Sequence, residues 1–496
     1  YTDVGAFEFT GTSALLLTAP NGGENWTAGD TETITWTSSG VANVKIEISR
    51  DHGATWSEVV ASTPAASGSY SWSVTAPGTS DAFIRVSDAA DSSVWDLSDS
   101  DFWILSDSII YVDAAATGNA DGTSWADAYT HIADAATNAS FGDEVWVAEG
   151  TYTPNGNPQV LLLAQGIEFF GGFPSGGGGF ADRDPSLYPT ALDGQGAVDH
   201  VVVAEDHATL DGFTITGGVA NGAWPNGVSG GGMLIDNVSP TISNCTFTGN
   251  SADTYGGAVY IVGEGAQPTF TDCTFDGNTA GNGGGCLYFT QSASPHVTGT
   301  LFTQCVGDSF GGAITGSGSS QPFPAITLTD CTFVDNTGGW GGGVSLTNNS
   351  ADTTIVGCTF ENNTADTAYG GGLYLSNTSA TVMDTVFSGN TAGDADSGRG
   401  GGVSQYGSSD SVFTNCVFVG NTAGGNNLGG GGLFNDGDTH ATLVNCSFGY
   451  NSATGTGAAG GAIHHNDGDL TLTNCVLWSD TAPTDDELHL AGTGVS

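Results

Sequence analysis

Short runs of alternating hydrophobic and polar residues recur along most of the chain, and their spacing is the main structural signal. Between residues 247 and 477, a phrase Cys-x-Phe-x-x-Asn, followed by a glycine cluster and another alternating run, returns every 27 to 31 residues. Its hydrophobic marks are Phe247, Phe275, Phe302, Phe333, Phe360, Phe387, Phe418, Phe448 and Leu477. Alternation predicts strands, and a period of this length predicts one coil of a solenoid.

Two other positions of the repeat hold one residue type in most coils. Three residues after the mark, at a turn, stand Asn250, Asn278, Asn336, Asn363, Asn390, Asn421 and Asn451, and we expect their amides to stack in a ladder. Two residues before the mark stand Cys245, Cys273, Cys331, Cys358, Cys416, Cys446 and Cys475. Equivalent residues of stacked coils lie about 4.8 Å apart. The thiols therefore form either an inward ladder of reduced cysteines or disulfides between coils, such as Cys416 to Cys446.

The chain divides into three parts. Residues 1–10 predict an isolated strand. Residues 11–107 contain short alternating runs between turn signals, which predict a small β-sandwich. Residues 108–496 predict the solenoid, with a cap and first coils over 108–200 and regular coils over 201–496. Residues 123–136 are the one predicted helix, placed to cover the open N-terminal end of the solenoid.

Several segments resemble secreted bacterial proteins. Residues 20–29, Pro-Asn-Gly-Gly-Glu-Asn-Trp-Thr-Ala-Gly, resemble Ig-like modules. Residues 142–152, Gly-Asp-Glu-Val-Trp-Val-Ala-Glu-Gly-Thr-Tyr, resemble the opening coils of right-handed parallel β-helix proteins. From Gly230 the repeats resemble the Gly-Gly-Ala-Ile and Phe-x-x-Asn repeats of polymorphic outer-membrane-type adhesins. The resemblance implies an all-β chain, an Ig-like sandwich followed by a right-handed parallel β-helix, but it leaves function open.

The composition is strongly acidic. Asp and Glu number 53 against 5 Lys and Arg, which gives a net charge of −48. Such a surface repels nucleic acid and anionic membranes, and no apolar run is long enough for a membrane span. We therefore expect an extracellular or cell-surface protein. Because the chain opens at Tyr1, we expect either a removed leader or a segment of a longer polypeptide.

Calcium is the one expected cofactor. The tetrapeptide Asn-Asp-Gly-Asp occurs at 435–438 and again at 466–469. If these turns stack, Asp436, Asp438, Asp467 and Asp469 offer the oxygen ligands that calcium prefers. The alternative is an Asp-Gly turn used only for its backbone shape. His464 and His465 point to opposite faces of a strand, so they cannot chelate one ion together.

The sequence indicates no catalytic residue. A lyase of this fold needs a basic residue beside its substrate, and after residue 200 only Arg399 is available. A hydrolase needs carboxylates that converge on one face. The adjacent pair Asp485 and Asp486 is predicted to have no cationic or His partner. We therefore expect a protein that is not an enzyme.

The two ends of the chain predict assembly. Asp3, Val4, Ala6, Phe7 and Phe9 form a segment that resembles the strand closing the C-terminal end of such β-helices, yet it precedes the sandwich. At the other end, Leu488, Leu490 and Val495 belong to an open parallel edge, which favours strand addition. A tandem array and a filament built by strand donation both explain this arrangement, and both make head-to-tail contacts.

Together these patterns predict a non-catalytic extracellular structural protein, a unit of a cell-surface fibre, sheath or stalk with an adhesive role. The expected partner is the protein itself, with glycans or other surface proteins as further partners. Two alternatives remain open. One is a carbohydrate-active β-helix enzyme, a lyase or hydrolase, with a targeting sandwich. The other is a monomeric adhesin that binds glycans.

Overall fold

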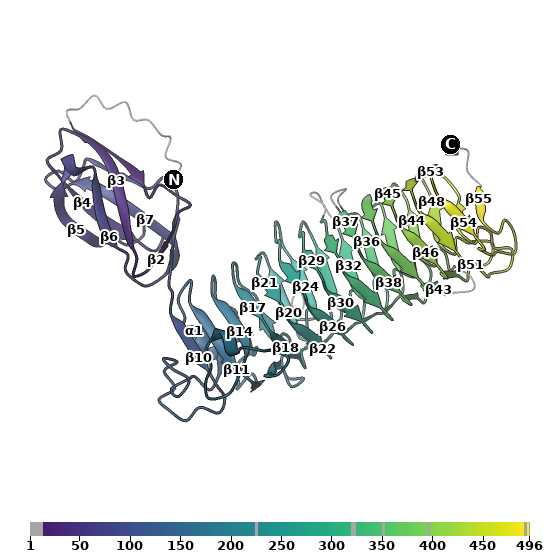
Figure 1. The fold of residues 1–496 in the computed structure, drawn as a ribbon, viewed down its shortest axis with the longest axis horizontal. Coiled ribbons are helices and arrows are strands. Elements are labelled where there is room, and N and C mark those ends of the chain that lie inside the picture. The colour runs from purple at the N-terminus through teal and green to yellow at the C-terminus, as the bar shows by residue number, and fades with distance from the viewer. Residues whose placement is uncertain are drawn as a thin grey trace.

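The computed structural model describes residues 13–223, 227–318, 324–349, 353–393, 397–490 and 494–495. A group of N-terminal strands is joined to a long rod of stacked coils (Figure 1). The predicted N-terminal strand, with Asp3, Val4, Ala6, Phe7 and Phe9, lies outside the described residues. The structure therefore does not test that prediction.

The N-terminal strands form two sheets that are largely antiparallel. One has the order β1 (Ala14–Ala19), β3 (Thr31–Ser39), β6 (Ser69–Ser73). The other has the order β2 (Asn25–Thr27), β9 (Phe102–Leu105), β7 (Thr79–Asp88), β4 (Asn43–Ser49), β5 (Ser57–Pro64), with β8 (Trp95–Leu97) beside β7. Their buried residues form a hydrophobic cluster of their own, which includes Trp26, Trp36 and Trp72. The antiparallel sheets are as expected, while the Ig-like arrangement stays a prediction.

The rod is an all-β solenoid of parallel strands, as the repeat predicts. A representative coil contains β21 (Thr241–Ser243), β22 (Thr246–Thr248), β23 (Ser251–Ala252) and β24 (Val259–Val262). Stacking of the coils gives four parallel sheets, which we number 1 to 4 in the order in which a coil visits them. Sheet 1 has 14 strands, from β10 (Ile109–Val112) to β56 (Gly494–Val495). Sheet 2 has 12 strands, sheet 3 has nine and sheet 4 has 12.

Sheet 4 is the sheet on which the candidate site lies. Its strands, in order along the rod, are β13 (Leu161–Leu162), β16 (Val202–Val203), β20 (Met233–Asp236), β24 (Val259–Val262), β28 (Leu287–Thr290), β32 (Ile314–Ser317), β36 (Val344–Thr347), β40 (Leu373–Ser376), β44 (Val403–Tyr406), β48 (Leu433–Asp436), β52 (Ile463–His465) and β55 (Leu488–Leu490). Within a strand such as β40, Leu373 and Leu375 belong to the core cluster. The residues between them therefore face outward.

The hydrophobic marks of the repeat form one column inside the rod. Ring centroids from Phe247 to Phe448 follow each other at 4.4 to 5.0 Å, and the rings are stacked nearly parallel. These distances equal the spacing of hydrogen-bonded strands. The coil register is thus set by side chains of one size at one position.

The predicted Asn ladder also forms, but the turn geometry differs from expectation. Each ladder Asn is buried, and where an Asn also stands in the preceding coil, the side-chain oxygen accepts hydrogen bonds from the backbone and side-chain N–H groups of that Asn. The left-handed conformation belongs to the residue before it, for example Gly249 or Asn362. The reason is that the ladder Asn must point its amide into the rod, so the preceding residue makes the turn.

The cysteines follow the inward-ladder alternative. Six of the seven repeat cysteines are buried and free, and Cys475 is half-buried and free. The predicted alternative of a Cys416–Cys446 disulfide is not formed. One disulfide does exist, between Cys286 and Cys305, with a Cα separation of 5.6 Å. It uses the two cysteines that stand outside the repeat position, and Cys305 occupies a place in the Asn ladder, where its N–H donates to Asn336.

The N-terminal end of the rod carries the one α-helix among the described residues. It is α1 (Ile132–Asn138), shorter and later than the predicted 123–136. The preceding residues form turns, in which Asp121 and Asp127 accept backbone and hydroxyl hydrogen bonds. These side-chain bonds compete with a helix, which explains its late start. Ile132 and Ala135 pack on the first coils, so the helix covers the end of the core as expected.

Candidate functional site

The outer face of sheet 4 carries a row of aromatic side chains along several coils. One column stands at the corner before the strands, and a second stands on the strands themselves. We call the row the aromatic track, and its members are Tyr255, Tyr260, Tyr288, Phe310, Trp340, Tyr369 and Tyr374. Five of them are half-buried, while Tyr288 and Tyr374 are buried beneath their neighbours. The track therefore presents ring surface to solvent while its base is packed.

The rings of the track contact each other in two groups. In the first, Tyr255 lies 4.2 Å from Tyr288 between ring centroids. In the second, Trp340 lies 5.6 Å from Phe310 and 5.9 Å from Tyr369. Offset and edge-to-face contacts at these distances are the favoured aromatic geometries. The rings are thus mutually held in place.

A polar cluster follows the track toward the C-terminus of the rod. Arg399 lies in the column of Tyr369, and its guanidinium sits 5.0 Å from the centroid of that ring and 5.3 Å from the centroid of Phe434. Its Nη1 lies 3.3 Å from the Asp436 carboxylate, and both side chains are about four-fifths buried. The Asn466 amide donates to the same carboxylate at 2.8 Å. Asp436 is thus a carboxylate with two fixed partners on the outer face.

Next in the stack is His464, whose ring lies 5.1 Å from that of Phe434. Nδ1 lies 3.2 Å from the carbonyl oxygen of Ala459. A carbonyl only accepts, so Nδ1 carries the proton and Nε2 carries the lone pair. Burial lowers the pKa of His464 to about 4, and the nearby Arg399 acts in the same direction. The imidazole is therefore neutral at ordinary pH and can accept a proton at Nε2.

The last member of the cluster is a His and Asp pair. The His489 ring lies 4.6 Å from that of His464, and its Nδ1 lies 2.6 Å from a carboxylate oxygen of Asp485. The prediction that Asp485 has no His partner is therefore wrong. The two residues are four apart, and the short strand β55 brings them together. The polar cluster consists of Arg399, Asp436, His464, Asp485 and His489.

His465 shows the opposite placement. It is fully buried, in the inward column of sheet 4 that also contains Gln405 and Asn435. The expectation that the two adjacent histidines face opposite sides is confirmed. Only His464 reaches the outer face, so only His464 belongs to the polar cluster.

The predicted calcium ligands are spread over two faces. Asp436 lies on sheet 4 beside Arg399, whereas Asp469 begins β53 (Asp469–Thr473) on sheet 1 and lies 3.3 Å from Nε2 of His440. Asp438 and Asp467 are exposed, and the latter accepts from Gly468. The two turns are 31 residues apart, but Asn435 pairs with His465, 30 residues on. The tetrapeptides are therefore offset by one residue, and calcium binding there stays a prediction.

A second metal-like grouping lies in the N-terminal sheets. His52, Asp81 and Asp101 bring one ligand atom each to within 4.8 Å of one another, and this is the one such group among the described residues. His52 lies 2.8 Å from Asp101, and all three side chains are at the surface. An exposed His and Asp contact of this kind also serves as a simple ion pair.

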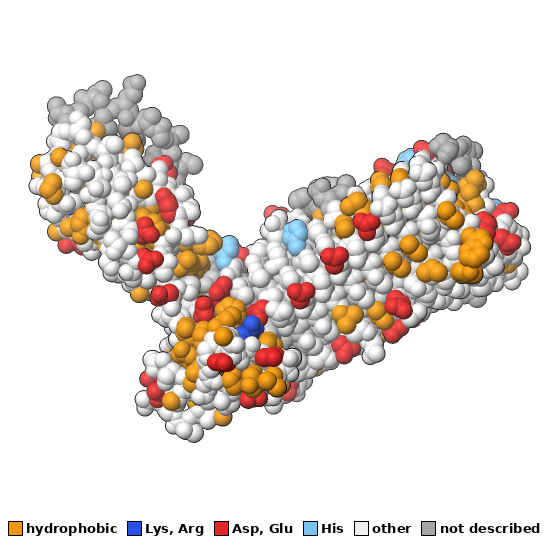
Figure 2. Space-filling view, viewed as in Figure 1, with side chains coloured by type: hydrophobic (Ala, Val, Ile, Leu, Met, Phe, Trp, Pro, Cys, Tyr) orange, Lys and Arg blue, Asp and Glu red, His pale blue; other side chains and the backbone are white. Residues whose placement is uncertain are grey.

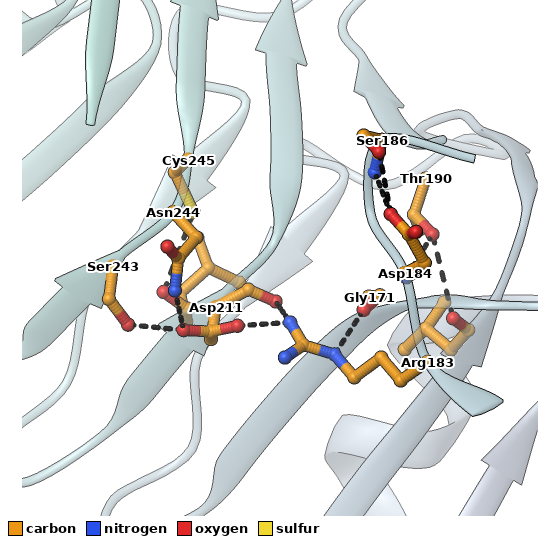
Figure 3. A network of polar contacts seen from close by, with 12 residues as sticks. Gly171, Arg183, Asp184, Ser186, Thr190, Asp211, Ser243, Asn244 and Cys245 are labelled. Atoms are coloured by element: carbon orange, nitrogen blue, oxygen red, sulfur yellow. Dashed lines mark hydrogen bonds and ion pairs between the residues drawn. The ribbon is translucent and has the colours of Figure 1, made fainter. Parts of the chain in front are cut away.

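Arg183 and Asp211 form a largely buried ion pair near the start of the rod (Figure 3). Arg183 donates to the carbonyl oxygen of Gly171 and to Asp211, while Ser243 and Asn244 donate to the same carboxylate. The contacts join the loop after β14 (Glu168–Phe173) to two successive coils. The pair is therefore explained by its structural role.

The residues of the open C-terminal edge lie where they are expected. Leu488 and Leu490 belong to β55, the last strand of sheet 4, and the backbone of Val495 pairs with Leu470. Leu488 packs against the core cluster. None of these residues joins the polar cluster.

The sequence did not reveal the aromatic track. Its members stand at different offsets from the repeat marks, and glycine or threonine takes their place in several coils. The usable signal was the residue directly before each glycine cluster, where Tyr255, Trp340, Tyr369 and Arg399 stand. The sequence identified Arg399 only as the one basic residue after residue 200, and in the structure its side chain reaches over the outer face of sheet 4.

Comparison with known proteins bears on the fold. A search of curated proteins finds no match. Among solved structures, the chain resembles the A-module of mannuronan C-5 epimerase AlgE4 from Azotobacter vinelandii, with 13% identity, 78% of this chain and 99% of that chain covered and a TM-score of 0.29. It also resembles the catalytic unit of a thermostable GH87 α-1,3-glucanase from Streptomyces thermodiastaticus, with 15% identity, 93% and 90% coverage and a TM-score of 0.30.

These comparisons correct the functional expectation. Both structures are named as carbohydrate-active enzymes, whereas the sequence predicted a non-catalytic fibre or stalk protein that is not an enzyme; those predictions are withdrawn. The likeness itself concerns the fold, and the chemistry of this chain has to be argued from its own residues. No helix among the described residues is long and apolar enough to cross a membrane. The model of the right handed beta helix region family matches residues 199–392, and the rod is a right-handed parallel β-helix.

Proposed function

We propose that this protein is a carbohydrate-active enzyme that hydrolyses glycosidic bonds, with the polar cluster on sheet 4 as its reaction centre. One observation carries the proposal. A carboxylate, a neutral imidazole with a free lone pair and a His and Asp pair stand together on the outer face, at the end of a row of partly exposed aromatic rings.

The groups of the cluster supply the parts that hydrolysis needs. His464 takes a proton from the attacking water at Nε2. It can do so because its low pKa keeps the imidazole neutral. His489, oriented by Asp485, donates a proton to the leaving oxygen. The carboxylate of Asp436, held by Arg399, stabilises the positive charge that develops on the sugar ring. The glycosidic C–O bond breaks, and the water oxygen joins the anomeric carbon.

The same cluster argues against chemistry on uronate polymers. Such chemistry needs a cation free to hold the substrate carboxylate. After residue 200, Arg399 is the one Lys or Arg in the sequence, and its guanidinium is already paired with Asp436 and covered by two rings. Hydrolysis does not require a free cation, so the geometry favours it.

We also propose that the enzyme acts outside the cell and that its N-terminal sheets form an Ig-like module. The net charge of −48 supports an extracellular setting, and the cluster of buried tryptophans supports an independent module. Acidic side chains are scattered over the visible face of the molecule, while cations are nearly absent from it (Figure 2).

The test is release of reducing ends from a panel of soluble polysaccharides. We expect Asp436→Asn, His464→Ala and His489→Ala each to lower kcat by on the order of 10²- to 10⁴-fold, the usual contribution of a positioned acid or base. His440→Ala and Asp469→Asn are the matched controls, because these residues form an equivalent contact on sheet 1. Equal losses in the controls, or a wild type that releases no reducing ends from any polymer, would contradict the proposal.

A further inference from the structure

The aromatic track is long, continuous with the polar cluster and placed almost entirely on its N-terminal side. Sheet 4 contains nine strands from β24 to β55. The track itself runs from β24 to β40, four rises of about 4.8 Å or about 19 Å, and together with the polar cluster the row reaches eight rises, about 38 Å. Arg399 begins the polar cluster at β44, and three strands follow it to the end of the described sheet. A ligand that covers the track must therefore be an extended polymer, with most of its bound length on one side of the reaction centre.

The side chains of the aromatic track are suited to binding an uncharged ligand. Its seven members are Tyr, Phe and Trp side chains, and none of them carries an ionised group. The corner loops that hold them add carboxylates, since Asp253, Asp308 and Asp366 are exposed and stand two or three residues before Tyr255, Phe310 and Tyr369. Arg399 is the single cation along this row and is already paired. A polyanion would meet an acidic rim, whereas the apolar faces of sugar rings can stack on the aromatic side chains.

Unpartnered polar atoms lie on the same face. Ser345 Oγ, Ser404 Oγ and Arg399 Nε are buried and have no hydrogen-bond partner among the described residues. Ser345 and Ser404 stand in the strand column on either side of Tyr374. Buried polar atoms are nearly always satisfied by protein or by water. The three atoms mark positions where ordered water or ligand hydroxyl groups complete the hydrogen bonding.

From these observations we infer that the aromatic track binds an uncharged polysaccharide lengthwise and delivers it to the polar cluster near one end of the bound segment. The inference rests on the proposed function, because the polar cluster supplies the reaction. It adds the substrate class and the direction in which the bound chain extends, toward the N-terminal end of the rod.

Affinity electrophoresis separates binding from turnover. Asp436→Asn, disabled in the reaction, is run in native gels that contain a soluble β-glucan, an α-glucan, a mannan or the uronate polymer polygalacturonate. We expect at least one uncharged polymer to retard the protein and polygalacturonate to leave it unretarded. Adding Trp340→Ala should weaken the retardation at least tenfold in polymer concentration.

The matched control is Trp478→Ala in the same background. Trp478 is 60% exposed and stands at the end of β54 (Val476–Trp478) on sheet 2, beside Tyr450 and away from the track. It should leave retardation unchanged. Tyr255→Ala, at the far end of the track, serves as a second probe if circular dichroism shows Trp340→Ala to be misfolded.

Each result decides between the two proposals. Equal weakening by Trp340→Ala and Trp478→Ala, or no retardation by any polymer, overturns the track as a binding site. Retardation by polygalacturonate alone overturns the uncharged class while leaving an enzyme at the polar cluster intact. Retardation that depends on Trp340, in a wild-type protein that releases no reducing ends, supports the track and contradicts the proposed hydrolysis.

Discussion

His464 and His465 are adjacent in sequence, but their side chains lie on opposite faces of the strand and have different surroundings. His464 points outward onto Phe434 and keeps a free Nε2, whereas His465 points into the rod, where its Nε2 lies 3.2 Å from the carbonyl oxygen of Gly468. Strand alternation predicts this opposition from sequence alone. Which of the two joins the polar cluster depends on Arg399 and His489, which lie in other coils, and that could not be predicted from the local pattern.

The pKa of His464 sets an expected acid limb for activity. Because burial lowers its pKa to about 4, the imidazole is neutral above that pH and protonated below it. We therefore expect kcat/KM to fall as the pH is lowered through about 4. The measurement is a pH profile of the initial rate, with circular dichroism at each pH to show that the protein stays folded.

His440→Ala should leave this acid limb in place. His440 is exposed, and its contact with Asp410 raises its pKa above the ordinary 6.5, so it titrates in a different range. A limb centred near 6.5 in the wild type would assign the base to another group and would count against His464.

At the scale of elements, the repeat determines the stacking and leaves the site undetermined. The Phe column and the Asn ladder could be predicted because each coil repeats the same residue at the same position. The aromatic track could not, because its members occupy positions where glycine, threonine and serine also occur. The proposed function depends on residues that depart from the repeat, such as Trp340 and Arg399, and a consensus of the repeat does not contain them.

The Asn ladder is expected to carry much of the local stability. The side chain of Asn363 accepts two hydrogen bonds from Asn336 and donates to Phe333 and Asn390. Asn363→Ala removes these bonds. The backbone N–H of Asn336 then loses this acceptor, while Asn390 Oδ1 keeps the backbone N–H of residue 363. Each buried group left unsatisfied costs about 1 to 3 kcal/mol. We expect a lower midpoint of thermal unfolding and faster hydrogen exchange in the two adjacent coils.

The control for this substitution is Asn138→Ala. Asn138 is exposed at the end of α1, and its amide donates to the backbone of Asp134. A surface change of this kind alters stability by about 0.5 kcal/mol or less. Equal losses of stability in the two variants would show that the ladder amides contribute no more than an exposed Asn.

At the scale of the whole molecule, the rod turns a short repeat into one long surface. Length, period and the parallel arrangement of the coils were predictable, because every coil must bury its hydrophobic face against its neighbours. The predicted head-to-tail assembly came from the two ends of the chain and stays a prediction. The two ends of the chain gave no indication of the long face of sheet 4. That face is built from side chains 27 to 31 residues apart in sequence.

The C-terminal end of the rod is expected to loosen as the pH rises. Burial raises the pKa of Glu487, and the adjacent carboxylate of Asp480 raises it further. The folded state therefore holds a proton that the unfolded chain releases near pH 4.5. The stabilising contribution is complete below that pH and is lost as the pH rises through the higher pKa of the folded state.

Hydrogen exchange of residues 480–490, corrected for intrinsic rates, measures this effect. Between about pH 4 and pH 7 we expect protection to decrease in the wild type and to stay constant in Glu487→Gln, which keeps the shape of the side chain without its charge. A similar decrease in both proteins would assign the pH response to another group.

The Asn ladder also gives the rod an electrical direction. From Asn336 onward, each ladder amide donates toward the C-terminal side, as Asn421 does to Asn451 and Asn451 does to Asp480. The side-chain dipoles are therefore parallel, with their positive ends turned toward the last coil. Asp480 takes the place of an Asn there, and its carboxylate can only accept, so a negative charge meets the positive end of the stack. Reversing the sign of that end group would oppose every dipole behind it.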